Sequence, residues 1–375
     1  MSHKQQSMIR CVLSLAICFS LLSVHARAEQ STSGGDEGQS LSQQLNLPDS
    51  TRWLADVASR IKLHGYAQGW YYYQNAGGKT TNTFLCKRTI LWANAQITPR
   101  WSFLFMHDFN SVVQEYYTDY RISQNNLLTV RFGQFKTALS YENPLSPTAM
   151  ETVDVYSEGV TYLTGCGSDP LGGVQYGRDQ GIAIFGETDN RFLRYELQLM
   201  NGSGINVRDK NNTKDVIARL EIRPAKGLDI CVTGMVGRGN ALSSSILNPG
   251  ILPGENYRRN RATVGADYKS ACFNVHGEFL QGWDGDVISR GAYITGSVPL
   301  IPSKLDAVGS YDYFNFNTTA GYDMHKAVIG LQYWFFRKCR FQLQYVYKNA
   351  DTNYSTYFNR SDVHQIICQM QVRFN

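Results

Sequence analysis

The sequence predicts a transmembrane antiparallel β-barrel of about sixteen strands. Three observations support this fold class: polar and apolar residues alternate along many segments, short and long connections alternate between these segments, and the composition favours strands. The chain has 375 residues, including 23 Tyr, 18 Phe and 33 Gly. Its mean hydropathy is −0.32, which argues against a membrane protein built from apolar helices.

Residues 1–28 have the features of a secretory signal peptide. Lys4 and Arg10 precede the apolar run CVLSLAICFSLLSV, and the small residues Ala26 and Ala28 fit a cleavage site. The run is shorter than the about 20 residues of a spanning helix, which disfavours a membrane anchor. Cleavage would remove three bases and no acid, so the formal net charge of +5 would fall to +2. That balance does not favour nucleic acid as a partner.

Residues 29–59 are predicted to be a periplasmic N-terminal linker that ends in a short helix. The segment EQSTSGGDEGQSLSQQLNLPDS is polar and rich in Gly, Ser and Gln, as linkers are. In TRWLADVASRI, Trp53, Leu54 and Val57 share one helical face. The helical period then disappears, and residues 60–375 are predicted to form the barrel.

Period-two alternation defines the strands. In RFLRYELQL, the polar residues Arg194, Glu196 and Gln198 alternate with apolar ones, and ARLEIR and ACFNVHGEFL behave in the same way. This period predicts strands with one solvated and one apolar face. The predicted strands are 60–73, 83–98, 99–110, 114–123, 126–136, 179–187, 190–201, 214–224, 226–238, 257–268, 270–282, 287–299, 302–315, 322–336, 338–349 and 362–375.

The connections between these strands predict how the barrel is oriented. Links after even strands are short, such as ITPRW, SQNN, ETDN and RPAKG. Links after most odd strands are longer, such as YQNAGGKTTN, NGSGINVRDKNNT and NADTNYSTYFNRSD. Transmembrane barrels have short periplasmic turns and long outer loops. A soluble sandwich is the alternative, but its turns need not alternate in length, and sixteen strands in one open sheet would leave edges that closure removes.

The alternation also assigns the faces of the predicted barrel. Apolar residues are expected to face lipid, and polar residues a lumen wide enough for water. The residues predicted to line the lumen include Lys62, His64, Arg88, Arg219, Glu221, Arg223 and Glu278. The aromatic residues predicted for the interfacial girdles are Tyr71, Tyr73, Trp92, Tyr268, Trp334 and Phe374.

The connection after Lys136 is far longer than its neighbours. It runs to about Asp179 and carries apolar residues such as Leu139, Val153 and Leu163, which suit a packed loop. We expect this third outer loop to fold into the lumen and constrict it; a flap on the outer surface is the alternative. The residues predicted for the constriction and its anchors are Lys136, Glu142, Glu151, Asp154, Glu158, Arg178 and Asp179.

Two of these assignments stay open at this stage. Arg178 and Asp179 either anchor the loop to the wall or form an ordinary pair at the start of a strand. The direction of Lys136 is ambiguous because a bulge near Gly133 would reverse the alternation.

The chain resembles the family of outer-membrane porins named for the phosphate-selective porins O and P. FGQFKTALSYE and YGRDQGIAIFG, on the two sides of the long loop, carry this resemblance, and YELQLMNGSGIN, DVIARLEIRP and FQLQYVYKN support it. The resemblance covers roughly residues 60 to 375 and implies a sixteen-stranded, commonly trimeric barrel that conducts small solutes. Thr137-Ala138-Leu139 departs from the x-Pro-Phe of the family, and the chain ends in Asn375 rather than an aromatic residue.

The charges of the long loop do not predict an anion filter. Residues 137–177 contain Glu142, Glu151, Asp154, Glu158 and Asp169 but no Lys, Arg or His. Phosphate selection requires a cluster of bases at the narrowest point. Wall bases such as Arg88, Arg219 and Arg223 would make a transverse field across the pore if they faced the loop. We therefore expect passive diffusion of small hydrophilic solutes or ions with weak selectivity; an anion- or phosphate-selective porin and a loop-displaying adhesin or scaffold are the alternatives.

No motif of enzyme chemistry is present. The sequence lacks G-x-S-x-G, HExxH and a P-loop. His276 and Glu278 share a strand face, but hydrated lining is the simpler interpretation. The six cysteines that would remain after cleavage form no CxxC pair, so neither a disulfide framework nor a metal site is expected. The sequence predicts no enzyme and no cofactor. The predicted location is the outer membrane of a Gram-negative cell, with lipid, small solutes or inorganic ions and two further copies of the chain as partners.

Overall fold

The computed structural model describes residues 57–167, 171–350 and 362–374. Contacts divide the chain into two units, residues 1–62 with 94–96, and residues 63–93 with 97–375. The predicted signal peptide and most of the predicted linker lie outside the described residues, and residues 57–59 are helical. Among the described residues, no helix is both long and apolar enough to cross a membrane.

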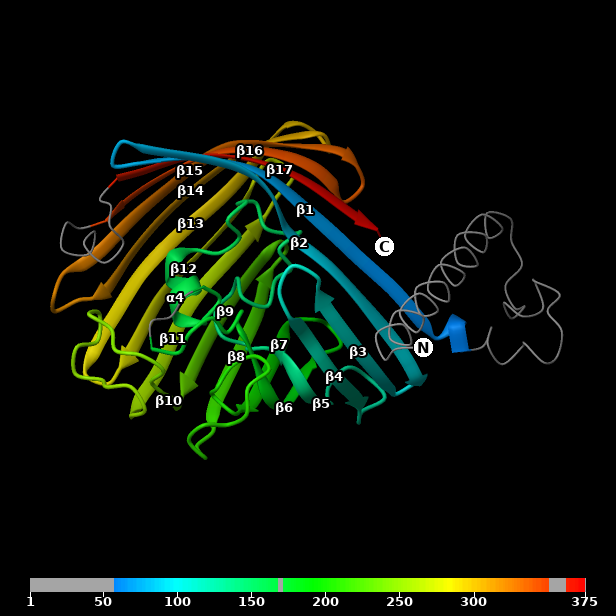
Figure 1. The fold of residues 1–375 in the computed structure, drawn as a ribbon. Helices are drawn as coiled ribbons and strands as arrows, with labels where there is room; N and C mark the ends of the chain where they lie inside the picture. Colours follow the sequence, from blue (N-terminus) through cyan, green and yellow to red (C-terminus); the bar gives the residue numbers. More distant parts are fainter. Residues whose placement is uncertain (1–56, 168–170, 351–361, 375) are drawn as a thin grey trace, which may run out of the picture. The chain divides into compact units, whose positions relative to one another are not determined.

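The second unit is built almost entirely from strands (Figure 1). The strands of the chain are β1 (Ile61–Ala76), β2 (Lys79–Thr98), β3 (Trp101–Asp108), β4 (Val113–Arg121), β5 (Thr129–Lys136), β6 (Arg178–Glu187), β7 (Leu193–Met200), β8 (Asp215–Ala225), β9 (Leu228–Val236), β10 (Arg238–Asn240), β11 (Asn256–Lys269), β12 (Asn274–Asp284), β13 (Val287–Ile301), β14 (Leu305–Asn317), β15 (Tyr322–Phe336), β16 (Cys339–Ala350) and β17 (Asp362–Phe374). One helix, α4 (Glu158–Leu163), lies between β5 and β6. Only Gly237 separates β9 from β10, so the two form one wall strand and the predicted number of sixteen is confirmed.

The sheet closes on itself. Each strand pairs antiparallel with its neighbours, and β1 pairs with β17 from Gly65 opposite Phe374 to Ala76 opposite Val363. Closure satisfies the backbone groups that edge strands would leave unpaired, which is a requirement in lipid. The predicted antiparallel barrel is therefore confirmed.

The two faces of the wall differ as the alternation predicts. On β8, Val216 and Leu220 are 45% and 40% exposed, whereas Arg219 between them is 6% exposed. Phe279 on β12 and Ile329 on β15 are exposed in the same way. Exposed apolar side chains on the outer face and buried polar ones on the inner face reverse the order of a soluble barrel, and agree with a wall that faces lipid.

The first connection differs from the prediction. A long outer loop was expected between residues 73 and 83, but β1 and β2 continue to Ala76 and from Lys79, so only Gly77 and Gly78 form the turn. Their φ values are 57° and 79°. Positive φ at both central positions is characteristic of the type I′ turn, which extends a hairpin without splaying its strands.

The girdle prediction is wrong for two of its six aromatic residues. The Trp92 ring stacks on His64 at 5.1 Å between centroids, and the Trp334 Nε1 donates to Asp306 at 2.9 Å, both on the inner face. Tyr268 and Phe374 are 39% and 42% exposed on the outer face, as expected. An aromatic residue near a strand end fits a girdle only when its alternation points outward, and here residues 92 and 334 share their side with Arg88 and Gln332.

Connections at the two ends of the barrel differ in length. At one end, which we call the turn end, residues 99–100, 122–128, 188–192, 226–227, 270–273, 302–304 and 337–338 join the strands. At the other end, the loop end, the described connections range from two residues at 77–78 to the long 137–177 connection. The expected connection at 350–361 lies almost wholly outside the described residues.

Candidate functional site

The 137–177 connection packs against inward-facing side chains of the wall. Ser157 is the N-cap of α4 and accepts a hydrogen bond from the Val160 N–H. The α4 residues Val160 and Leu163 are buried in one apolar cluster with Leu280 and Phe314, which are inner residues of β12 and β14. Packing on these nearby strands, which are far from the helix in sequence, therefore fixes the helix, which is too short to be stable alone.

Ser140 is held between two charged wall residues. Its Oγ donates to Glu278 Oε2 at 2.7 Å, and the Tyr141 N–H donates to Glu278 Oε1 at 2.9 Å. The Arg219 guanidinium donates to the Ser140 carbonyl. Ser140 has a φ of 69°, a left-handed conformation that is costly for a residue with a Cβ. The predicted lumen residues Arg219 and Glu278 thus bind the connection in an unusual conformation.

Two carboxylates of the connection and two wall lysines form a cluster of four ion pairs. The Lys348 Nζ lies 2.8 Å from Glu158 and 3.4 Å from Asp154. The Lys326 Nζ lies 3.2 Å from Glu158 and 3.3 Å from Asp154. We call these four residues the charge cluster.

The pKa of each carboxyl in the charge cluster is lowered. Burial alone raises the pKa of Asp154 and of Glu158, but the ammonium groups of Lys348 and Lys326 more than offset that effect. Both side chains therefore stay ionised at neutral pH, and the cluster is balanced in charge.

Glu142 and Glu151 approach the same histidine. Glu142 is 1% exposed, accepts the Ser157 N–H at 2.8 Å and lies 3.4 Å from His276 Nε2. Glu151 lies 3.9 Å from His276 Nδ1. His276 therefore serves as a partner of the connection and not as the hydrated lining expected from the sequence.

A row of residues on β16 binds the backbone of the connection. Arg340 donates to the Met150 carbonyl at 2.6 Å. The Gln344 Nε2 donates to the Glu151 carbonyl at 2.7 Å, and its Oε1 accepts the Val153 N–H at 2.8 Å. These amide contacts satisfy backbone groups that would otherwise be buried without partners.

The residues at the two ends of the connection have different partners. The Lys136 Nζ donates to the carbonyls of Asn143 and Leu145 at 2.8 and 2.6 Å, so it points to the connection. Arg178 pairs with Glu115 at 2.7 Å. Asp179 accepts from the Gly202 N–H, which belongs to the next loop-end connection. Of the two alternatives left open for Asp179, anchoring of the 137–177 connection is therefore not what these hydrogen bonds do.

The other predicted lumen residues pair mainly within the wall. Arg88 donates to Gln68 at 3.0 Å, Glu221 pairs with Arg219 at 2.6 Å, and Arg223 pairs with Glu187. Neither Arg88 nor Arg223 forms an ion pair with the connection among the described residues. His64 lies on the inner face against Trp92, and Lys62 is exposed in the first unit.

Several residues that hold the connection were missed. Lys326 and Lys348 neutralise its acids, Arg261 donates to the Leu163 carbonyl at 3.2 Å, and Asp312 accepts the Glu158 N–H at 2.5 Å. Arg261 and Lys348 lie on the polar side of alternating strands, so alternation contained a signal for these two, whereas Asp312 and Lys326 share their inward side with apolar residues such as Phe314 and Val328. What the sequence did not show is which of many inward charges face the loop.

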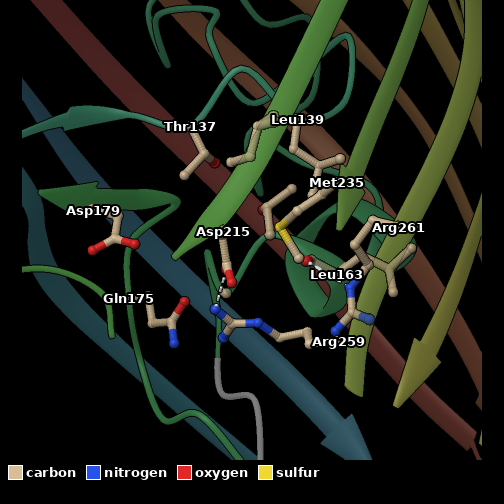
Figure 2. A pocket seen from close by; sticks show the side chains of 12 residues that line it. Thr137, Leu139, Leu163, Gln175, Asp179, Asp215, Met235, Arg259 and Arg261 are labelled. Atoms are coloured by element: carbon tan, nitrogen blue, oxygen red, sulfur yellow. Dashed lines mark hydrogen bonds and ion pairs between the residues drawn. The ribbon is translucent and has the colours of Figure 1, made fainter. Parts of the chain in front are cut away.

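A small cavity lies between the connection and the wall (Figure 2). Its volume is ≈ 20 Å³, and its lining includes Thr137, Leu139, Asp179 and Met235. Figure 2 shows Arg259 reaching Asp215 across its lower side, at 2.6 Å. A cavity of this size holds about one water molecule. It is too small to carry a solute.

Comparisons with known proteins concern the fold. No family model and no curated protein matches this chain. An anion-selective porin from Comamonas acidovorans matches with a TM-score of 0.61 and 10% identity over 84% of this chain and 99% of that one. Pseudomonas putida OprB matches with a TM-score of 0.61 and 8% identity over 87% and 96%.

A third solved structure is the trimer form of the Vibrio cholerae outer-membrane protein OmpT. It matches with a TM-score of 0.57 and 13% identity over 84% of this chain and 99% of that one. The resemblance to the phosphate-selective porins O and P has no family match behind it and stays a prediction. The chain shares the closed sixteen-stranded barrel fold of these outer-membrane porins.

Proposed function

We propose that this chain is an outer-membrane porin through which small hydrophilic solutes or ions diffuse passively. An apolar outer face and a polar inner face, joined in one closed sheet, support a barrel that spans a membrane around water. The features of a signal peptide in residues 1–28 support export to the outer membrane of a Gram-negative cell. The trimer form of OmpT supports a homotrimer.

The 137–177 connection is proposed to narrow the channel. Its contacts reach inner residues of β8, β12, β15 and β16, such as Arg219, Glu278 and Lys348. A segment tied to the wall at several distant strands stands across part of the lumen rather than outside it. In this proposal Glu142, Glu151, Asp154 and Glu158 surround the narrow region with Lys136 at its entry.

Weak selectivity follows from the charge cluster, and this is the observation that carries the proposal. Asp154 and Glu158 are each within 3.4 Å of two lysines, so the acids do not present an unbalanced negative field to a passing ion. A channel selects strongly for one sign when uncompensated charges of the other sign line its narrowest point. Here opposite charges alternate instead.

Planar bilayer recordings test the proposal. The purified protein should give discrete conductance steps, and its reversal potential in a potassium chloride gradient should lie close to zero. Liposomes that contain it should swell in sugars at rates that fall as the sugar grows. A strong anion preference that phosphate suppresses would favour the phosphate-selective alternative. A folded barrel without conductance would favour the adhesin or scaffold.

A further inference from the structure

The turn end of the barrel carries a repeated pair of residues, one exposed aromatic next to one exposed base. Trp101, Tyr120 and Tyr268 are 43%, 48% and 39% exposed on the outer face, and Phe192 and Phe336, beside their turns, are 48% and 61% exposed. Each is adjacent in sequence to an exposed base, and these bases are Arg100, Arg121, Arg191, Lys269 and Arg337. The pairs belong to five of the seven turns.

Three more exposed bases complete this ring. Lys226, Lys304 and Lys338 lie on the turn residues 226–227, 302–304 and 337–338. We call the eight bases together the basic turn ring. Each of the seven turns contains a base of the basic turn ring or begins directly after one. Of the eight, only Lys269 forms an ion pair with another described residue, with Asp267 at 2.6 Å.

The ring has almost no acidic counterpart. Among the turn residues themselves, Asp189 is the sole carboxylate beside six bases. The described loop-end connections are different, because outside the 137–177 connection they carry Arg208, Lys210 and Lys214 together with Asp209, Glu255 and Asp286. Excess positive charge therefore belongs to one end of the barrel and is not a property of the whole chain.

The aromatic partners decide where these bases lie. Exposed Trp, Tyr and Phe at a strand end sit at the boundary between hydrocarbon and headgroups. A base one residue beyond such an aromatic then reaches the level of the phosphates, because Lys and Arg extend their charged ends toward the polar layer. The Arg337 guanidinium lies 5.8 Å from the centre of the Phe336 ring, which shows one such pair in contact.

We propose that the basic turn ring binds the headgroups of anionic phospholipids in the membrane leaflet at the turn end. The proposal rests on the proposed function, since it requires a barrel inserted in a membrane. Exposed bases at headgroup level fit a lipid phosphate, to which Arg and Lys donate charge-assisted hydrogen bonds. The ring would hold the barrel at a fixed depth and collect anionic lipid around it.

Native mass spectrometry of the detergent-purified full chain, titrated with phosphatidylglycerol and with phosphatidylcholine, tests this proposal. The natural protein should bind phosphatidylglycerol more tightly, by roughly tenfold when several bases near a surface contribute. The fourfold variant Arg100→Gln, Arg121→Gln, Arg337→Gln, Lys338→Gln should lose most of that preference. In about 1 M sodium chloride, where the Debye length is about 3 Å, the preference should also fall.

A matched variant separates position from total charge. Lys79→Gln, Arg208→Gln, Lys210→Gln, Arg238→Gln neutralises four exposed bases at the loop end and should keep the preference for phosphatidylglycerol. Equal binding of the two lipids by the natural protein, or equal loss in both variants, would overturn the proposal. So would full competition by inorganic phosphate, which would identify a site for the free anion.

Conductance of the same preparations in phosphatidylcholine bilayers distinguishes the two proposals. Channels that conduct without any lipid preference would contradict the basic turn ring and leave the porin intact. A barrel that prefers phosphatidylglycerol but does not conduct would contradict the porin alone.

Discussion

Lys348 of β16 and Glu158 of α4 form an ion pair of 2.8 Å that ties the 137–177 connection to a wall strand near the other end of the chain. Lys326 on the neighbouring strand β15 reaches the same carboxylate at 3.2 Å. The two lysines thus bind the connection together. Neutralising them should change the ion selectivity of a channel that the connection lines.

Neutralising one sign of the charge cluster should create selectivity. In the double variant Lys326→Gln, Lys348→Gln, the acids Asp154 and Glu158 lose their partners, so the reversal potential in a potassium chloride gradient should shift toward cations. Asp154→Asn, Glu158→Gln should shift it toward anions. The variant that combines these four substitutions should again have a reversal potential near zero. If neither double variant moves the reversal potential, the charge cluster does not face the ion path.

The same carboxylates predict an acid transition. Their folded-state pKa values lie below the unfolded values of about 3.8 for Asp154 and 4.5 for Glu158. A lowered pKa gives stability that is complete above the unfolded values and is lost as the pH falls through the folded ones. Single-channel conductance should therefore stay constant from neutral pH to about 4.5 and become noisy only in stronger acid. Asp154→Asn, Glu158→Gln should be noisy already at neutral pH and show no such transition.

Ser140 offers a test of the strained contact. Ser140→Ala removes the hydrogen bond to the Glu278 carboxylate and should cost about 1.5–3 kcal/mol. Ser140→Val adds a β-branched side chain at a φ of 69° and should cost about 1–3 kcal/mol more. In urea unfolding in detergent, the free energy of unfolding should decrease from the natural protein to Ser140→Ala and again to Ser140→Val. Equal stability of the Ala and Val variants would show that the backbone relaxes there.

The assignment of faces is tested on β8. Leu220 is 40% exposed on the outer face, and Leu220→Arg should destabilise the membrane-inserted barrel by about 2–4 kcal/mol near the midplane. Glu221→Gln, one residue further on the inner face, should fold normally and change conductance instead. Heat-modifiable mobility in gel electrophoresis reports folding for both. Normal folding of Leu220→Arg would mean that this face does not meet lipid.

The strands could be predicted from the sequence because closure in lipid enforces strict alternation. β8 is an example: Arg219 and Glu221 point inward, as their positions predict, because any other register would place charge in hydrocarbon. Turn geometry is less constrained, so the long loop expected after β1 is instead the two-residue Gly77–Gly78 turn. Periodicity also places Trp92 on the same side as the predicted lumen residue Arg88, so the girdle assignment of Trp92 overlooked a signal that the alternation contained.

The partners within the candidate site could not be predicted. The sequence showed that residues 137–177 hold acids without bases, and that wall bases would have to face them. It did not show that Lys326 and Lys348 take this role while Arg88 and Arg223 pair elsewhere. Contacts between a loop and strands far away in the chain depend on how the loop crosses the barrel, and alternation carries no information about that path.

The pairing of β1 with β17 has a consequence for biogenesis. One edge of residues 65–76 pairs with β2, but the other finds its partner only in residues 363–374, so the wall cannot close before the last strand of the chain has arrived. Until then the edges of β1 and β17 remain unpaired and can pair with other chains. Pairing between strands so far apart in the sequence is slow. The unfolded protein must therefore stay bound to chaperones over its whole length. A mutation that disrupts β1 or β17 should lead to degradation rather than to a smaller functional pore.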